Sequence, residues 1–230
     1  MDILSQLSHF QTLDFAALGC VLFAWTFIGW WIERASNTHH SVSIMMAQYR
    51  REWMHQMVTR DPRIFDAQIL GSLRQGTAFF ASTSVIAIGG TLALLGNADQ
   101  LAGVAHDITA TARPAIVWEV KLLVLVIFLT NAFLKFAWSN RLFGYCAVLL
   151  AATPNEPDDA KAYVRAEQAA EINISAARSF NRGLRSIYFA LSTVAWLAGP
   201  VALMAATTFT FTVIWRREFA SHSRKVLLNG

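Results

Sequence analysis

The chain has 230 residues, a length that suggests one domain or at most two. Hydrophobic residues make up 55% of it and charged residues only 15%, whereas a soluble globular domain carries about 25% charged residues. The composition therefore disfavours a soluble domain. The formal net charge of +4 does not indicate nucleic-acid binding, because the positive residues flank the most apolar segments.

Four long apolar segments predict membrane-spanning helices. They cover residues 13–32, 77–95, 116–136 and 187–214. Crossing the hydrocarbon core of a bilayer takes about 20 predominantly apolar residues, and each segment meets or nearly meets that length. A helix in lipid satisfies its own backbone polar groups. We therefore expect an all-α protein, a four-transmembrane-helix bundle that forms a single integral membrane domain over residues 1–230.

The distribution of Lys and Arg predicts how the bundle is oriented. Six of these residues lie in the loop 33–76 and six in the loop 137–186, whereas the loop 96–115 contains only Arg113. Cytoplasmic loops are enriched in Lys and Arg. We therefore expect both long loops in the cytoplasm and the N-terminus outside, as in a multi-pass protein of a bacterial inner membrane.

The C-terminal tail conflicts with this orientation. Four positive residues follow the fourth segment: Arg216, Arg217, Arg224 and Lys225. A turn at Gly199-Pro200 would return the tail to the cytoplasm, but each half of the segment would then have about 14 residues, or ~21 Å, which is too short to span. We therefore expect four spans and an outside tail.

Both long loops are predicted to form helical extensions in the cytoplasm. Apolar residues in the first loop recur at three- and four-residue steps, as on one face of a helix: Val42, Met45, Met46, Tyr49, Trp53 and Met57. Asp61-Pro62 predicts the start of a second helix that runs to about Leu95. In the other long loop, residues 153–157 interrupt the helical pattern, and an alanine-rich helix is expected to follow toward the fourth span.

Polar side chains inside the spans have two interpretations. Ser82, Thr83 and Ser84 lie together in the second span, and Asn131 lies in the third. Such groups hold membrane helices together by hydrogen bonds, and they also line polar pores. We expect helix packing at these positions, with a polar path as the alternative.

Ionisable residues in membrane segments are candidates for function by default. Asp14 and Lys121 lie at the predicted outer ends of the first and third spans, and Glu33 and Lys135 lie at the inner ends. Two intramembrane charge pairs are therefore predicted. They either clamp the bundle, with long side chains reaching the headgroups, or form part of a permeation or proton path.

No motif in the sequence predicts an enzyme. The chain has no phosphate-binding loop, no nucleophile elbow, no zinc-protease motif and no dinucleotide fingerprint. All six histidines lie outside the predicted spans, which disfavours a bis-histidine haem. We predict no catalytic residue, no cofactor-binding residue and no metal-binding residue.

Four local strings carry a family resemblance. They are YRREWM at residues 49–54, RIFD at 63–66 with FFASTS at 79–84, KFAWSNR at 135–141, and RGLRSIYF at 182–189. In this order, and over about residues 14–219, the chain resembles the domain-of-unknown-function 599 family of integral membrane proteins. The resemblance implies a helical membrane protein without an assigned activity, and it brings no catalytic residues.

Charged residues of these strings are expected at the cytoplasmic membrane surface. They are Arg50, Arg51, Arg63, Asp66, Arg141, Arg182 and Arg185. Guanidinium groups pair with carboxylates or with phosphates. One interpretation is an internal lattice in which Asp66 and Glu52 are the acceptors, and the other is contact with anionic lipid headgroups. We expect a mixture of the two.

The absence of a recognisable site favours a structural role. We expect a structural or accessory subunit of a membrane assembly, with the lipid bilayer and its anionic headgroups as partners and no nucleic acid. The alternative is a homo-oligomeric channel or small-solute transporter, which the hydroxyls at residues 82–84 and Asn131 would favour.

Overall fold

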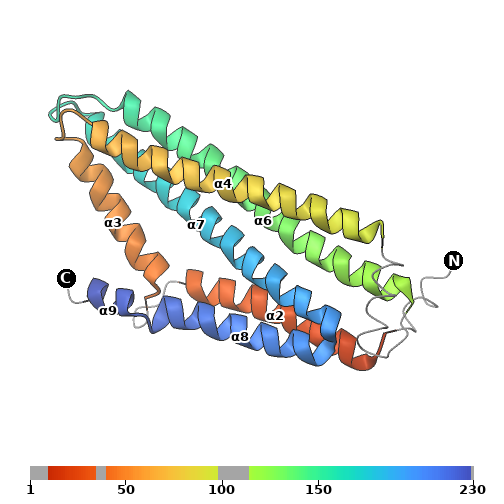
Figure 1. The fold of residues 1–230 in the computed structure, drawn as a ribbon. Helices are drawn as coiled ribbons and strands as arrows, with labels where there is room; N and C mark the ends of the chain where they lie inside the picture. The colour runs from red at the N-terminus through yellow and green to blue at the C-terminus, as the bar shows by residue number, and fades with distance from the viewer. Residues whose placement is uncertain (1–9, 35–39, 98–113, 229–230) are drawn as a thin grey trace. The chain divides into compact units, whose positions relative to one another are not determined.

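The computed structural model describes residues 10–34, 40–97 and 114–228 (Figure 1). The helices in these ranges are α2 (Thr12–Glu33), α3 (Val42–Met57), α4 (Ile64–Leu95), α6 (Ala115–Ala152), α7 (Ala162–Val194), the 3₁₀ helix η1 (Ala195–Ala198), α8 (Pro200–Phe219) and α9 (His222–Leu228). No strand is present in the same ranges, so the predicted all-α class is confirmed.

Among the described residues, three helices are long and apolar enough to cross a membrane. They are α2, α4 and α6, with 22, 32 and 38 residues, and they contain the predicted spans 13–32, 77–95 and 116–136. These helices are compatible with a membrane protein. The predicted helical extensions are also present, since α4 begins at Ile64 and α3 has the expected length.

The fourth predicted span, residues 187–214, is not one helix. α7 ends at Val194, η1 follows, and α8 begins at Pro200 after Gly199, whose φ of 123° favours glycine. Proline suits the first position of a helix, so Gly199-Pro200 ends one helix and starts another. Ser192 on α7 lies 2.7 Å from Thr210 on α8, measured between the side-chain oxygens. The prediction of a continuous fourth span is therefore wrong, and α8 turns back along the end of α7.

The C-terminal tail lies beside the segment that follows α2. The backbone N and the Oγ of Ser43 donate hydrogen bonds to the Glu218 carboxylate over 3.1 and 3.0 Å. Arg224 Nε donates to the carbonyl oxygen of His40 over 3.1 Å. The predicted placement of the tail and the first long loop on opposite sides of a membrane is therefore wrong.

Packing divides the chain into two compact units. Unit 1 comprises Met1–Trp30, Thr83–Ala132 and Arg185–Trp215, and unit 2 comprises Trp31–Ser82, Phe133–Leu184 and Arg216–Gly230. Large buried side chains of unit 1 include Val21, Ile28, Leu122, Trp196 and Leu203. The core of unit 2 joins Met54, Met57 and Phe143 to alanines of α7, among them Ala162, Ala166, Ala169 and Ala170.

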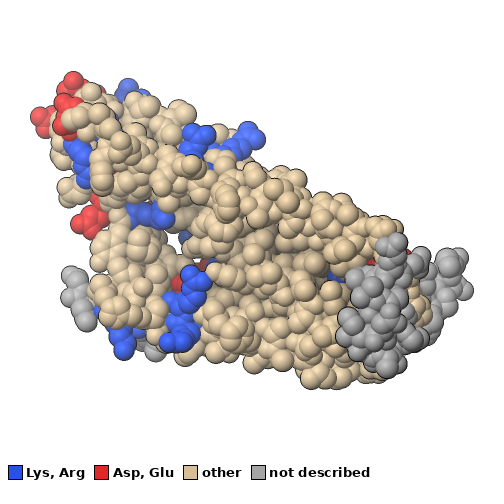
Figure 2. All heavy atoms as spheres, in the orientation of Figure 1, with Lys and Arg blue, Asp and Glu red and all other residues tan. Residues whose placement is uncertain are grey.

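The surfaces of the two units differ in charge. On the face drawn in Figure 2, most visible charged side chains lie over unit 2, and the visible surface of unit 1 is almost all uncharged. Large apolar side chains of unit 1 are exposed, including Phe23, Ile86, Val201 and Phe209. Exposed apolar side chains at this density suit a lipid or partner-protein environment rather than water.

Candidate functional site

A buried polar cluster joins three elements of unit 1. It consists of Asp14 on α2, Lys121 on α6 and Trp196 in η1, which are 1%, 2% and 1% exposed. Trp196 Nε1 donates to Asp14 Oδ1 over 2.8 Å, and Lys121 Nζ donates to the carbonyl oxygen of Trp196 over 2.8 Å. The two charged residues predicted to pair are thus in one cluster, and Trp196 bonds to both of them.

The position of each charge in the Asp14–Trp196–Lys121 cluster matches a helix end. Asp14 lies in the first turn of α2, where the N-terminal end of the helix favours a negative charge. Lys121 donates to a carbonyl of η1, next to the C-terminal end of α7, where the carbonyl end of a helix favours a positive charge. The ammonium also lies 4.9 Å from the centre of the Trp118 ring. This geometry favours the clamp interpretation of the outer pair over a permeation path.

The second predicted pair, Glu33 with Lys135, is wrong. Arg182 Nε donates to both carboxylate oxygens of Glu33, over 2.9 and 3.1 Å, and its Nη2 bonds the same carboxylate. This hydrogen bonding raises the pKa of Arg182 above its ordinary value. The Lys135 ammonium has no hydrogen-bond or ion-pair partner among the described residues. A planar guanidinium can form two parallel hydrogen bonds with a carboxylate, a geometry that an ammonium does not match as well.

Polar side chains near the predicted path take part in helix packing. Asn131 Nδ2 on α6 donates to Ser186 Oγ on α7 over 2.6 Å. In unit 2, Ser139 Oγ on α6 donates to the carbonyl oxygen of Ala176 on α7 over 2.7 Å. These contacts are typical of hydroxyls and amides that hold membrane helices together.

The three consecutive hydroxyls on α4 do not share one environment. Ser84 is 1% exposed, whereas Ser82 and Thr83 are on the exposed surface. Ser82 belongs to unit 2, and Thr83 and Ser84 belong to unit 1. Their spacing along the helix points them in different directions, because successive residues of an α-helix are about 100° apart.

Asp66 is a buried acceptor in unit 2, as predicted. Its side chain is fully buried, and its Oδ1 accepts a hydrogen bond from Trp53 Nε1 over 2.7 Å. The same oxygen pairs with Arg60 Nη1. Burial of a polar group is costly unless it is hydrogen-bonded, and these two donors satisfy Oδ1. Asp66 therefore fixes the start of α4 to the end of α3.

Arg50 and Arg51 join α3 to α7. Arg50 Nη1 donates to Asn173 Oδ1, and Arg51 Nε donates to Glu171 Oε1 over 2.8 Å. Burial lowers the pKa of Arg50 because it disfavours the charged guanidinium. Glu52 is exposed and has no side-chain partner among the described residues. The prediction of Glu52 as an acceptor is therefore wrong, and acceptors on α7 take its place.

The other predicted arginines have separate roles. Arg63 donates to the carbonyl oxygens of Thr153 and Pro154, both over 2.6 Å, and so binds the carbonyl end of α6. Arg141 Nε donates to the Tyr145 hydroxyl over 2.5 Å. Arg185 is 7% exposed and belongs to unit 1. The expected lattice therefore forms only in part.

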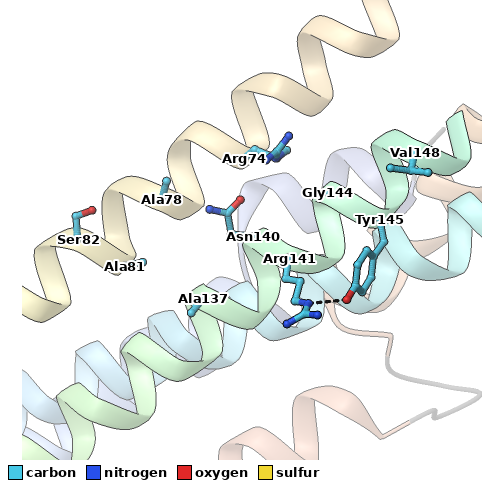
Figure 3. Close-up of a pocket in the computed structure, with 10 residues that line it drawn as sticks. All are labelled: Arg74, Ala78, Ala81, Ser82, Ala137, Asn140, Arg141, Gly144, Tyr145 and Val148. Carbon is cyan, nitrogen blue, oxygen red and sulfur yellow. Dashed lines mark hydrogen bonds between the residues drawn. The ribbon is translucent and has the colours of Figure 1, made fainter. Parts of the chain in front are cut away.

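A groove between α4 and α6 in unit 2 is the candidate binding site. It has a volume of about 640 Å³ and is drawn in Figure 3. Its polar lining consists of Arg74, Ser82, Asn140, Arg141 and Tyr145. The small side chains of Ala78, Ala81, Ala137 and Gly144 leave the space open. In Figure 3 the amide of Asn140 projects from α6 toward α4.

Sequence reasoning missed several residues of these contacts. Arg60, Glu171, Asn173 and Trp196 were not among the candidates. Arg60 lies six residues before Asp66, and the turn at Asp61-Pro62 brings the two together, a contact that helix spacing does not predict. Among the described residues, no three His, Cys, Asp or Glu side chains come together in a group that could hold a metal ion.

Comparison with known families supports the resemblance carried by the four strings. The sequence matches the family described as "Protein of unknown function, DUF599" over residues 16–223. The chain belongs to the DUF599 family. No curated protein and no solved structure matches the chain significantly. The DUF599 match includes Lys121, Trp196 and the whole α4–α6 groove, and Asp14 lies two residues before it.

We expect Trp196→Phe to destabilise the protein, because the substitution leaves the buried Asp14 carboxylate without its indole donor. The cost should be about 1–3 kcal/mol. Trp118→Phe is the matched control, because Trp118 is also buried and its Nε1 has no hydrogen-bond partner among the described residues.

Thermal unfolding of the purified variants in detergent measures this difference. The midpoint should fall further for Trp196→Phe than for Trp118→Phe. An equal fall for the two variants would mean that the Trp196–Asp14 hydrogen bond contributes nothing beyond ring packing.

Proposed function

We propose that this DUF599 protein is a structural or accessory subunit of a membrane assembly. The observation that carries the proposal is the exposure of α4. Only 11% of its most apolar stretch is buried within the chain, compared with 28% for α2 and 33% for α6. The apolar surface of α4 is therefore available to lipid or to a helix of another protein.

The small residues of α4 support contact with a partner helix. A Cβ atom built on Gly71, Gly76, Gly89 or Gly90 would meet nothing within 4 Å. Small residues allow two helix backbones to approach closely in a membrane, where dispersion and hydrogen bonding rather than the hydrophobic effect drive association. α4 thus presents both the apolar surface and the open positions that a helix–helix interface requires.

The alternative function, a homo-oligomeric channel or small-solute transporter, has weaker support. Asn131, one of the residues on which it depends, bonds to Ser186 inside unit 1. The buried charges Asp14 and Lys121 bond to Trp196 at helix ends. Polar groups that are already bonded to one another are poorly placed to replace the hydration shell of a solute.

Charge supports an orientation in which the tail and both long loops face the cytoplasm. The loops 33–76 and 137–186 carry six Lys and Arg residues each, and the tail carries four. The contacts of the tail with Ser43 and His40 bring it to the same end as the first loop. A hairpin of α7 and α8 thus removes the conflict with the positive-inside rule.

The proposed orientation predicts the behaviour of reporters fused to the chain in a bacterial host. A fluorescent protein fused after residue 230 should fluoresce, and alkaline phosphatase at the same position should be inactive, because it folds only outside the cytoplasm. Phosphatase inserted after Asn97 is the control and should be active. An active phosphatase at the C-terminus would contradict the orientation.

The accessory role predicts a protein neighbour on α4. A photo-crosslinking residue in place of Ile86, which is 75% exposed, should form an adduct with one other protein chain at native expression levels. The control position is Phe23 on α2, which is 66% exposed and should label lipid only. Mass spectrometry of the adducts identifies the neighbour.

Two outcomes of the crosslinking would contradict the accessory role. Lipid adducts alone at residue 86 would mean that α4 faces the bilayer. Adducts only with a second copy of the chain would favour the homo-oligomeric alternative.

A further inference from the structure

The α4–α6 groove has an amphipathic lining. Its polar side chains are Arg74, Ser82, Asn140, Arg141 and Tyr145, and the rest of the lining is alanine, glycine and valine. No Asp or Glu lines the groove, so its two guanidinium groups give it a positive charge. A groove of this composition suits a ligand with one anionic end and one apolar part.

The donors of the groove are available to a ligand. Arg74, Asn140 and Ser82 have no side-chain hydrogen-bond or ion-pair partner among the described residues. Arg141 uses its Nε to bond the Tyr145 hydroxyl, and both of its Nη groups are without a described partner. In contrast, Arg51 and Arg182 in the same unit pair with carboxylates. The groove arginines are therefore not part of the internal network.

The surroundings of the groove are apolar and aromatic. Val148, in its lining, is 68% exposed, and Phe79 and Trp138, next to its lining residues in sequence, are 65% and 51% exposed. Exposed tryptophan and tyrosine beside basic residues are typical of the boundary between hydrocarbon and headgroups. This setting favours a ligand that itself lies at that boundary.

We propose that the α4–α6 groove binds an anionic phospholipid. The Arg74 guanidinium and the Asn140 amide bind the phosphate, because guanidinium groups bind phosphate through charge-assisted hydrogen bonds. Arg141, whose side chain Figure 3 draws on the side of α6 away from α4, adds positive charge at the rim of the groove. An acyl chain lies along Ala78, Ala81 and Ala137, where small side chains leave room for it. The inference goes beyond the accessory role and needs no particular partner protein.

Native mass spectrometry of the full chain in detergent tests the proposal. Titration with phosphatidylglycerol should give tighter binding than titration with phosphatidylcholine, which has the same acyl chains and no net charge. The Arg74→Gln/Arg141→Gln variant should lose affinity for phosphatidylglycerol by roughly 30-fold, since each basic residue beside an anionic lipid contributes about a factor of five.

The matched control removes two other arginines of unit 2. Arg178 and Arg216 are exposed, lie outside the lining, and have no side-chain partner among the described residues. Arg178→Gln/Arg216→Gln changes the net charge by the same amount and should retain the affinity of the unmodified chain. An equal loss in both double variants would overturn the proposal, because it would mean nonspecific attraction by net charge.

A third variant separates a lipid from a free phosphate. Gly144→Leu fills the groove without changing its charge, since a Cβ at Gly144 would meet nothing within 4 Å. It should weaken phosphatidylglycerol binding, whereas Gly71→Leu, at an equally open position outside the groove, should not. Full binding in Gly144→Leu, or displacement of the lipid by equimolar inorganic phosphate, would overturn the assignment of a phospholipid.

Discussion

The bonds that Trp196 makes with Asp14 and Lys121 are the contacts on which the rest of unit 1 depends. The last carbonyl groups of a helix lose their intrahelical donors, and a carbonyl that is buried without any donor is costly. The Trp196 carbonyl accepts hydrogen bonds from both the Gly199 N–H and the Lys121 ammonium, and the indole of Trp196 supplies a donor to Asp14. The buried charged groups of Asp14 and Lys121 and the polar groups of Trp196 at the helix break are thus hydrogen-bonded to one another.

This break determines the direction of the C-terminal helix. Gly199 supplies a backbone conformation that other residues rarely adopt, and Pro200 begins α8. Ser192 and Thr210 then bond across the hairpin. Because α8 turns back along the end of α7, Glu218 near the end of α8 can accept a hydrogen bond from Ser43. The tail, residues 216–230, therefore packs as part of unit 2. One local break therefore places four positive residues next to the other basic segments.

The length of the apolar segments allowed α2, α4 and α6 to be predicted from the sequence, and the three- and four-residue spacing of apolar side chains allowed α3 to be predicted, because both signals are local. Hydropathy did not predict the helix break within residues 187–214, since the apolar segment continues through Gly199-Pro200 although the helix does not. Partner choice was also hard to predict. Asp66 was identified as an acceptor, but the donor Arg60 lies across a turn, and Glu33 pairs with Arg182 rather than Lys135. Such choices depend on side-chain geometry between helices, which spacing within one helix does not contain.

The groove between α4 and α6 was not predicted for the same reason. Ser82 and Arg141 were candidates on separate helices, and their common site follows only from the packing of α4 on α6. Arg74 and Asn140 were not among the candidate site residues, although Asn140 lies in the KFAWSNR string at residues 135–141. What distinguishes them in the structure is that their side chains have no partner among the described residues.

Disulfide formation between residues 192 and 210 tests the central claim, the reversal of the chain at Gly199, most directly. With Cys20 and Cys146 replaced by alanine, Ser192→Cys/Thr210→Cys should crosslink under mild oxidation, because the two side-chain oxygens lie 2.7 Å apart. Ser192→Cys/Phe209→Cys should not, because Phe209 is 71% exposed. In a continuous helix, residues 192 and 210 would lie about 27 Å apart. The absence of a crosslink between them would contradict the hairpin and every conclusion built on it.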